Sequence, residues 1–284
     1  MEAISFKRII KISRFPHFWI WSAGFLSWGA MLAVGKEAFQ SPVFYILFLW
    51  FIFPANLFLN AINDAFDYET DIKNPRKQSL ESTVSKNGKK KMLLISLIAL
   101  VSVFFIFPFV SLLVIKLILI WIAIVFAYNV PPIRFKQYPI VDILFGGTGH
   151  YVMMLIIGYV SMSEVFPPLK FIVLGMIFMA AGHCLGESLD APYDTAAGIK
   201  NTTARLGTIK RGLVFSAFIF LASAVYGLFI GWPLFSIFVL IFPAIIFYNI
   251  LKENMEARSV LIFKEFIWAS AGFGFIIGTF LYWS

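Results

Sequence analysis

The chain has 284 residues, of which 60% are hydrophobic and 13% are charged, and its mean hydropathy is +0.87. This composition excludes a soluble domain of that size and predicts an integral membrane protein. The net charge of +8 is therefore assigned to basic residues that lie beside anionic membrane lipid at the cytoplasmic surface, and no nucleic-acid partner is expected.

Apolar segments of bilayer length follow one another along the chain. A membrane-spanning helix needs about 20 apolar residues, and nine stretches of the sequence meet this requirement. We therefore predict a single all-α, polytopic membrane domain, residues 1–284, with nine transmembrane helices around a central cavity. The predicted spans cover residues 17–34, 43–66, 92–108, 110–128, 140–161, 169–189, 212–230, 233–250 and 262–283.

The connections between these spans differ in length and charge. Long polar connections follow the second, fourth, sixth and eighth predicted spans. Of the 23 Lys and Arg residues, all except Lys36, Lys116 and Lys170 lie in the N-terminal segment, in these connections or at the adjoining helix ends. Nine spans place all of these segments on one side of the membrane, and the positive-inside rule makes that side cytoplasmic. We predict a cytoplasmic N-terminus in the cytoplasmic membrane.

The second span ends in the acidic sequence "NAINDAFDYETD". Charged residues at the end of an apolar span are costly and usually functional. Asn63, Asp67 and Asp71 are spaced four residues apart, so they share one face of a helix. Asp64 lies at the edge of that face. A row of oxygen ligands is therefore predicted at the cytoplasmic end of this span.

A second acidic cluster, "GESLDAPYD", ends the sixth span. Asp190 and Asp194 are again four residues apart, with Glu187 one turn earlier. Pro192 lies between them and cannot donate a helical hydrogen bond, so the helix is expected to end near Leu189 and to restart at the proline. Both clusters are predicted on the cytoplasmic side, where their mutual repulsion requires a cation.

Hard oxygen ligands without a Cys or His cluster suit Mg²⁺, which commonly completes its shell with phosphate oxygens. Two carboxylate clusters that face each other across a cavity can hold a diphosphate through Mg²⁺. Metal and basic side chains then stabilise the charge on this leaving group as an allylic C–O bond breaks. The metal ligands are predicted to be Asn63, Asp64, Asp67, Asp71, Asp190 and Asp194, and the basic candidates are Lys73, Arg76, Lys77, Arg134, Lys136, Lys200 and Arg205.

Three stretches resemble the UbiA superfamily of intramembrane prenyltransferases. "NDAFDYETD" is similar to its first Asp-rich motif, "DAPYD" with "GIKNTTARLG" to its second, and "YNVPPIRFK" to the loop after the fourth span. The resemblance covers nearly the whole chain. It implies Mg²⁺-dependent transfer of an allylic prenyl group from an isoprenyl diphosphate to a lipophilic acceptor. It implies catalytic roles for Asp67, Asp71, Asp190 and Asp194, and substrate binding by Asn63, Arg134, Lys136, Lys200 and Arg205. Glu187 is a further catalytic candidate and Arg76 a further substrate-binding candidate, both from their positions beside these motifs.

Within that superfamily, "INDAFDYETDIKNPRK" resembles the lycopene elongase branch, which adds five-carbon units to the ends of a carotenoid. This resemblance implies dimethylallyl diphosphate as donor and lycopene as acceptor. The few polar groups in the spans favour the same acceptor, because an aromatic acceptor needs polar partners and a base, whereas a polyene end does not. The alternatives are an aromatic quinone precursor or a glycerophospholipid as acceptor.

Other interpretations remain open at this point. Intramembrane acids also suit a proton-coupled transporter, although here they lie at one face and no inverted repeat is visible; a non-catalytic lipid-binding scaffold is a third class. Arg134 and Lys136 are alternatively simple topological anchors, and Asp142 is a candidate partner for either. Glu187 is a candidate general base, metal ligand or partner of His183. The two histidines in apolar surroundings, His150 and His183, are expected to be core residues.

Overall fold

A computed structural model describes residues 5–74, 77–78, 88–252 and 254–283 of the chain. Within these residues the chain forms helices and no strand. Nine helical segments of the described chain are long and apolar enough to cross a membrane. The prediction of an all-α protein with nine spans is therefore confirmed.

Several spans are built from more than one helical element. In the second span a π-helical turn at Phe51–Ala55, which contains Pro54, joins two α-helices. Proline removes one helical hydrogen bond, and a wider turn accommodates that loss. The helices of the nine spans are α2 (His17–Val34), α3 (Pro42–Trp50) with α4 (Asn56–Asp71), α6 (Lys89–Val101), α7 (Leu112–Asn129), α8 (Val141–Phe145) with α9 (Gly147–Ser163), α10 (Leu169–Ala196), α12 (Ile209–Phe229), α13 (Pro233–Val239) with α14 (Ile241–Ile250), and α15 (Ser259–Trp283).

Short helices lie outside or at the ends of these spans. The helix α1 (Phe6–Ile12) precedes the first span, and α11 (Thr202–Leu206) lies in the connection between α10 and α12. Single 3₁₀ segments at Gly35–Gln40, Ser102–Phe105, Phe107–Phe109 and Phe135–Gln137 complete the described helical elements.

The expected helix break near Leu189 is wrong. The helix α10 continues through Pro192 to Ala196, so Asp190 and Asp194 belong to one helix. A proline inside a helix costs about 3 kcal/mol, and packing of α10 along α12 and α9 offsets this cost. Gly212 of α12 lies so close to Ser188 that an added Cβ would come within 2.3 Å of the Ser188 hydroxyl.

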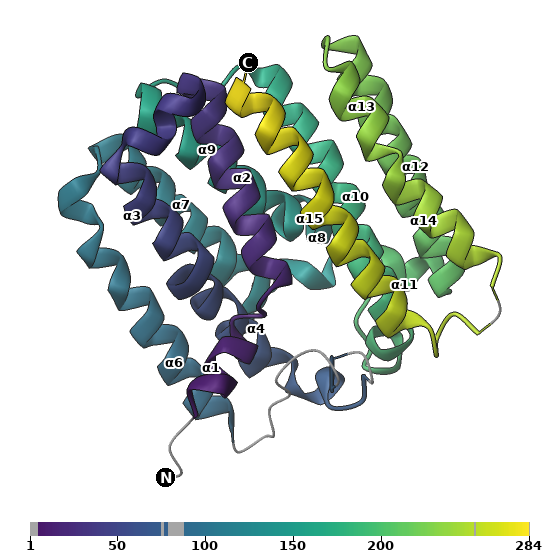
Figure 1. Cartoon of the computed structure of the whole chain (residues 1–284). Helices are drawn as coiled ribbons and strands as arrows, with labels where there is room; N and C mark the ends of the chain where they lie inside the picture. Colours follow the sequence, from purple (N-terminus) through teal and green to yellow (C-terminus); the bar gives the residue numbers. More distant parts are fainter. Residues whose placement is uncertain (1–4, 75–76, 79–87, 253, 284) are drawn as a thin grey trace.

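The helix α1 and the last residues of α15 lie at opposite ends of the helix bundle, and α1 lies at the end that also carries α11 (Figure 1). The helices α2 and α9 pack closely, as do α10 with α12 and α4 with α6. At the crossing of α2 and α9 two glycines allow backbone contact. A Cβ added at Gly29 would lie 2.0 Å from the Leu155 carbonyl oxygen, and one added at Gly158 would lie 2.2 Å from that of Leu26.

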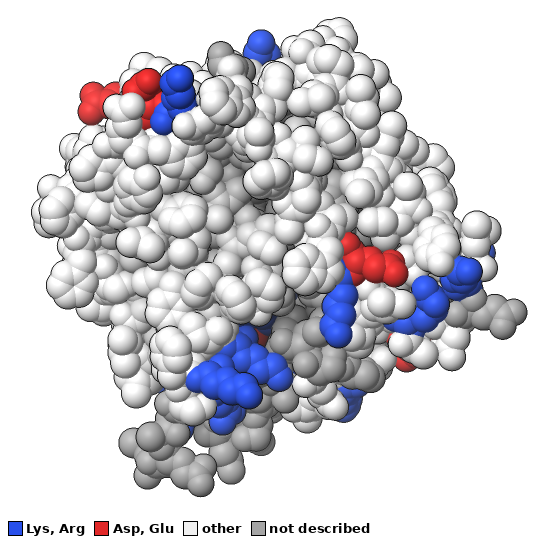
Figure 2. Space-filling view, viewed as in Figure 1, with Lys and Arg blue, Asp and Glu red and all other residues white. Residues whose placement is uncertain are grey.

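Figure 2 shows how charge is distributed on one face of the molecule. Lys and Arg side chains gather along the end where the N-terminus lies, a few charges mark the opposite end, and a broad uncharged band separates them. An uncharged band of this kind is expected on the lipid-facing surface of a membrane-spanning bundle. The arrangement places the polar ends of α4 and α10 at the basic end of the molecule.

Candidate active site

A cavity of about 200 Å³ opens among α2, α4, α7, α9, α10 and α15. Its wall on α10 is formed by residues three or four apart, from Met179 through His183 and Glu187 to Asp190 and Asp194. This spacing keeps them on one face of the helix. The α4 wall follows the same order, from Leu59 and Asn60 through Asn63 to Asp67. Both walls therefore change from apolar residues to amide or carboxylate groups toward the same end.

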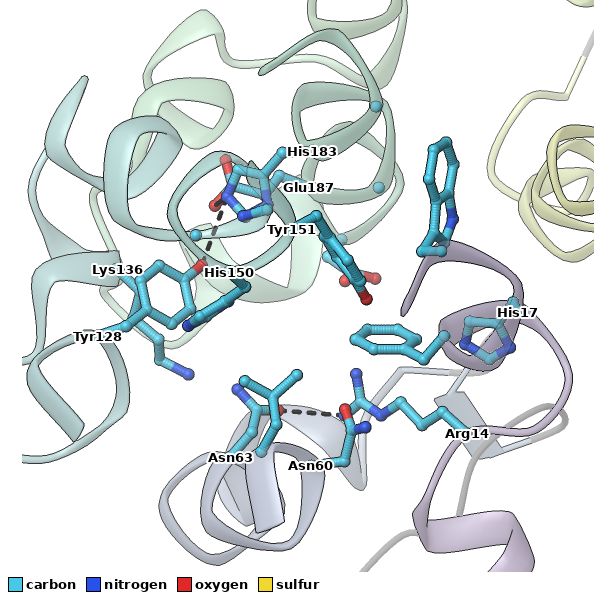
Figure 3. A pocket seen from close by; sticks show the side chains of 18 of the residues that line it. Arg14, His17, Asn60, Asn63, Tyr128, Lys136, His150, Tyr151, His183 and Glu187 are labelled. Atoms are coloured by element: carbon cyan, nitrogen blue, oxygen red, sulfur yellow. Dashed lines mark hydrogen bonds and ion pairs between the residues drawn. The ribbon is translucent and has the colours of Figure 1, made fainter. Parts of the chain in front are cut away.

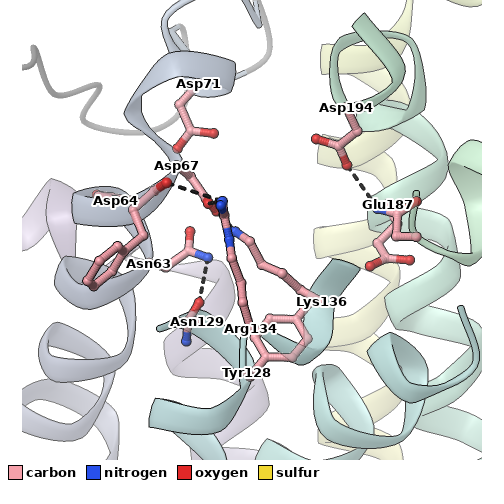
Figure 4. Close-up of polar contacts among 12 residues, drawn as sticks. Asn63, Asp64, Asp67, Asp71, Tyr128, Asn129, Arg134, Lys136, Glu187 and Asp194 are labelled. Carbon is pink, nitrogen blue, oxygen red and sulfur yellow. Dashed lines mark hydrogen bonds and ion pairs between the residues drawn. The ribbon is translucent and has the colours of Figure 1, made fainter. Parts of the chain in front are cut away.

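Asp67 is the carboxylate of the α4 wall, and two basic side chains from the connection after α7 contact it. Arg134 donates from Nη2 to Asp67 Oδ1 at 2.8 Å and to the Phe66 carbonyl oxygen at 3.2 Å. Lys136 donates to Asp67 Oδ2. Figure 4 shows both basic side chains between α4 and α10. Burial lowers the pKa of the Lys136 ammonium, and the Asp67 carboxylate acts in the opposite direction.

The backbone of Arg134 explains how its side chain reaches α4. Its φ of 41° lies in the left-handed region, which a non-glycine residue adopts at a cost of about 1–3 kcal/mol. The Arg134 amide donates to the Val130 carbonyl oxygen at 3.0 Å, which closes the turn after α7. The turn and the Asp67 ion pair together hold this conformation. The strained backbone of Arg134 therefore serves to bring its side chain to the candidate site.

Other side chains fix the remaining acids and amides of α4. Arg14 donates to Asp64 Oδ1 at 2.8 Å and to Asn63 Oδ1 at 3.1 Å. Asn63 in turn donates to Asn129 Oδ1 at 2.9 Å. Lys77 contacts Asp71 and lines the cavity. Sequence reasoning did not identify Arg14 or Asn129 as site residues; the position of Arg14 as the last basic residue before the first span was the available signal.

The acids of α10 accept hydrogen bonds from asparagine amides. Asn74, just beyond α4, donates to Asp190 Oδ1 at 2.6 Å and so links the two acidic walls. Asn201 donates to Asp194 Oδ2 at 3.0 Å while its Oδ1 accepts from the Ala204 amide at 2.8 Å, which caps α11. Both asparagines were missed in the sequence, because their contacts join segments that periodicity does not relate.

The structure brings some predicted site residues to the cavity and leaves others away from it. Asn63, Asp67, Lys136, Glu187, Asp190 and Asp194 line the cavity. Asp64, Asp71 and Arg134 contact residues that line it or belong to the same polar cluster. Lys200 and Arg205 have exposed side chains and are not among its described lining residues. Arg76 lies outside the described residues.

The expected partnership of Asp142 with Arg134 or Lys136 is wrong. Both basic residues contact Asp67 instead. Asp142 accepts hydrogen bonds of 2.6 Å from the Thr202 amide and from the Thr202 hydroxyl at the start of α11. Asp142 therefore links α8 to α11 by hydrogen bonds and does not form the ion pair that the sequence suggested.

A histidine and a glutamate of α10 form a second polar group at the cavity. His183 and Glu187 are four residues apart, and the distance from His183 Nε2 to Glu187 Oε1 is 3.0 Å. Glu187 is therefore a partner of His183, which is one of the three roles left open for it by the sequence. His150 is buried, as expected, and both histidines also line the cavity. Figure 3 shows His183 and Glu187 on one side of it, with Arg14 and Asn63 across from them.

The donor chemistry at the polar end of this cavity is compatible with Mg²⁺. The available groups are carboxylate and amide oxygens on two facing helices (Figure 4), which are the ligand types that Mg²⁺ accepts together with water and phosphate. Among the described residues no three His, Cys, Asp or Glu side chains converge on one point. Mg²⁺ commonly completes its coordination shell with water and with phosphate oxygens of a substrate.

Comparison with known proteins places these motifs in a family. The family model described as "UbiA prenyltransferase family" matches residues 22–270. A "Lycopene elongase/hydratase" of Halobacterium salinarum is 32% identical over 256 residues, which cover 85% of this chain and 86% of that protein. A protein of the same description from Corynebacterium glutamicum is 29% identical and covers 95% of both chains.

Solved structures share the fold. A UbiA homolog from Archaeoglobus fulgidus bound to DMAPP and Mg²⁺ superimposes with a TM-score of 0.69 and 17% identity, covering 97% of this chain and 99% of that chain. The same homolog bound to GPP and Mg²⁺ gives a TM-score of 0.66 at 18% identity and covers 98% of this chain and 100% of that chain.

Proposed function

Because the chain belongs to the UbiA prenyltransferase family and is an integral, multi-pass membrane prenyltransferase, we propose that it transfers dimethylallyl groups from dimethylallyl diphosphate to the ends of lycopene, with Mg²⁺ as cofactor. The observation that carries the proposal is the pair of facing walls on α4 and α10, whose acidic ends meet an apolar chamber. The relatives named lycopene elongase/hydratase, and the DMAPP and Mg²⁺ bound to a homolog of the same fold, support this choice.

The proposed roles at the polar end follow from charge and contact. Asp67, Asp190 and Asp194, with Asn63, would hold Mg²⁺, and Asp64 and Asp71 complete the acidic set. The metal supplies neutralisation of the charge that develops on the leaving diphosphate. Basic side chains that contact these acids would also stabilise the negative charge on the leaving diphosphate, since hydrogen-bond donors fixed near a leaving group stabilise its charge. These side chains are Arg134, Lys136, Lys77 and Arg14.

The apolar part of the cavity supports a polyene acceptor. Trp21, Met179 and Phe266 line it, and such apolar and aromatic walls suit a hydrocarbon chain. A groove of about 540 Å³ runs between α2 and α15, lined by small residues such as Gly24, Ala271 and Gly274. On α2 it begins at Ile20, next to the cavity residue Trp21, and on α15 it begins at Ala271, one helical turn beyond the cavity residue Ile267. A rod-shaped polyene fits this geometry, with its end at the diphosphate and its length in the groove.

The test supplies the purified protein in lipid vesicles with lycopene, dimethylallyl diphosphate and Mg²⁺. We expect carotenoids heavier by one and by two five-carbon units, either hydrated at the new end or not, and no product from 4-hydroxybenzoate. Chelation of Mg²⁺ should abolish turnover. Prenylation of 4-hydroxybenzoate in place of lycopene would retain the family assignment and overturn the proposed acceptor.

The variant Asp190→Asn tests the acidic wall in the same assay. Loss of a ligand at the leaving group should lower turnover on the order of a thousand-fold, because several kcal/mol of transition-state stabilisation are lost. Glu256→Gln is the matched control: Glu256 accepts from the Tyr193 hydroxyl at 3.1 Å and is exposed outside the cavity. Wild-type turnover of Asp190→Asn would contradict the proposed site.

A further inference from the structure

The orientation of His183 is fixed by its surroundings on several sides. Its Nδ1 accepts a hydrogen bond of 3.1 Å from the Gly147 amide at the start of α9. A Cβ added at Gly146 would come within 2.4 Å of the imidazole ring, so glycine is required where the ring packs against the backbone. The Tyr128 hydroxyl lies 3.4 Å from Nε2. Because Nδ1 accepts from a backbone amide, the proton of the neutral ring is on Nε2.

Glu187 accepts a hydrogen bond from the Nε2–H group of His183 through one of its two carboxylate oxygens. His183 Nε2 lies 3.0 Å from Glu187 Oε1. The other oxygen, Oε2, is buried and accepts no hydrogen bond from a donor group among the described residues, and the Asp142 carboxyl lies near the Glu187 carboxylate. The Glu187 side chain is 11% exposed and lines the cavity. A carboxylate oriented through one oxygen by a histidine, with its second oxygen available, has the arrangement of a positioned general base.

Two further polar atoms at the same cavity lack partners in the described part of the chain. His150 Nε2 and the Tyr151 hydroxyl are buried without hydrogen bonds, and both residues line the cavity at 5% exposure. The Tyr128 ring lies between the two histidines, with its centroid 5.4 Å from that of His150 and 6.1 Å from that of His183. Polar atoms in an otherwise apolar chamber are the partners that a bound water molecule needs.

We propose that Glu187 accepts the proton released when water captures the tertiary carbocation of the elongated polyene, and that His183 is its positioning residue. This inference rests on the proposed function. The terminal double bond of the polyene donates its electron pair to C1 of the dimethylallyl group as the C1–O bond breaks, and the diphosphate leaves with that bond's electrons. A tertiary carbocation results on the polyene.

In the last step, water adds to this carbocation. Its oxygen forms a bond to the cationic carbon, one O–H bond breaks with its electrons retained by the oxygen, and the proton passes to Glu187 Oε2. The products are a tertiary alcohol, diphosphate and a protonated Glu187, which returns its proton to solvent. His150 and Tyr151 offer the hydrogen bonds that hold the water beside the cation.

The experiment uses the full-length protein in lipid vesicles with lycopene, dimethylallyl diphosphate and Mg²⁺ in ¹⁸O-labelled water. Wild-type product should be an elongated alcohol that carries ¹⁸O. In Glu187→Gln the ratio of labelled alcohol to released diphosphate should fall roughly 100-fold, the usual contribution of a general base. His183→Gln should lower the same ratio by a smaller factor. Both values are ratios, so they do not depend on the amount of folded protein.

The control is Glu265→Gln, which makes the same change in α15 at a side chain that accepts from Asn249 at 2.7 Å and is not a described lining residue. It should keep the wild-type ratio. An unchanged ratio in Glu187→Gln, an equal loss of alcohol and diphosphate release, or a wild-type elongated product without ¹⁸O would each overturn the inference. Absence of any elongated carotenoid from the wild type would overturn the proposed function itself, and the inference with it.

Discussion

Arg134 contributes to the site both through its backbone conformation and through the charge of its guanidinium group. Its left-handed backbone turns the chain after α7 back toward α4, and its guanidinium reaches Asp67 and the Phe66 carbonyl oxygen at once. A planar guanidinium can contact two acceptors and can also grip a phosphate in bidentate fashion, whereas an ammonium acts as a point charge. The shape of the Arg134 side chain should therefore matter beyond its charge.

We predict that Arg134→Lys raises the KM for the diphosphate donor at least tenfold, because one of two parallel hydrogen bonds to phosphate is lost. Lys252→Arg is the control, since Lys252 lies over the Tyr248 ring in the connection between α14 and α15, away from the cavity. Steady-state kinetics with dimethylallyl diphosphate measure the effect. Equal KM values for both variants would show that Arg134 acts only as a topological anchor.

Single residues also mark where sequence reasoning reached its limit. The four-residue spacing of Asn63 and Asp67 could be seen directly, because helical periodicity relates them. The contacts of Arg14 with Asp64 and of Asn74 with Asp190 join residues 50 and 116 positions apart. No local pattern encodes such pairs, which depend on how the helices pack. The role of Asp142 at α11 was missed for the same reason.

At the scale of elements, α10 and the α2–α9 pair decide where the site lies. The apolar runs predicted most span ends to within about six residues, yet α10 extends seven residues beyond its predicted end at Leu189. Local propensity at Pro192 was overruled by packing along the helix, which brings Asp190 and Asp194 onto the cavity wall. The contact of α2 with α9 depends on Gly29 and Gly158. These two glycines lie on different helices far apart in the sequence, so no local pattern predicts that they pack together.

We expect Gly158→Ala to lower the free energy of unfolding by about 1–3 kcal/mol or more, because its Cβ would overlap the Leu26 carbonyl and force the two backbones apart. Gly24→Ala is the matched control in α2, since its Cβ meets no described atom within 4 Å. The midpoint of thermal unfolding in detergent reports both effects. A Gly158→Ala protein as stable as Gly24→Ala would contradict the close backbone packing.

At the scale of the whole molecule, the charge distribution and the positions of α1 and the end of α15 at opposite ends of the bundle agree with the nine spans of the described chain (Figures 1 and 2). The orientation in the membrane follows from the basic residues alone and is our prediction. Composition and hydropathy sufficed for this level of description, because the bilayer acts on whole segments and not on individual contacts.

We predict that the connection between α10 and α12 faces the cytoplasm and that the connection between α2 and α3 faces outside. In a Cys184→Ala background, Lys200→Cys in intact cells should resist a membrane-impermeant thiol reagent, and Glu37→Cys should react. Both native side chains are exposed, so accessibility does not limit labelling. The reverse pattern would invert the proposed orientation and place the active-site opening outside.

The two sides of α2 have different neighbours. One side rests on the backbone of α9 through Gly29, and the other borders the groove beside α15. If lycopene is the acceptor, as proposed, we expect it to slide lengthwise along this groove without a hinge or lid movement of the kind that limits many enzymes. A carotenoid has two reactive ends, so it must leave, turn and return between additions. We expect the interval between the first and second additions to follow the viscosity of the surrounding lipid.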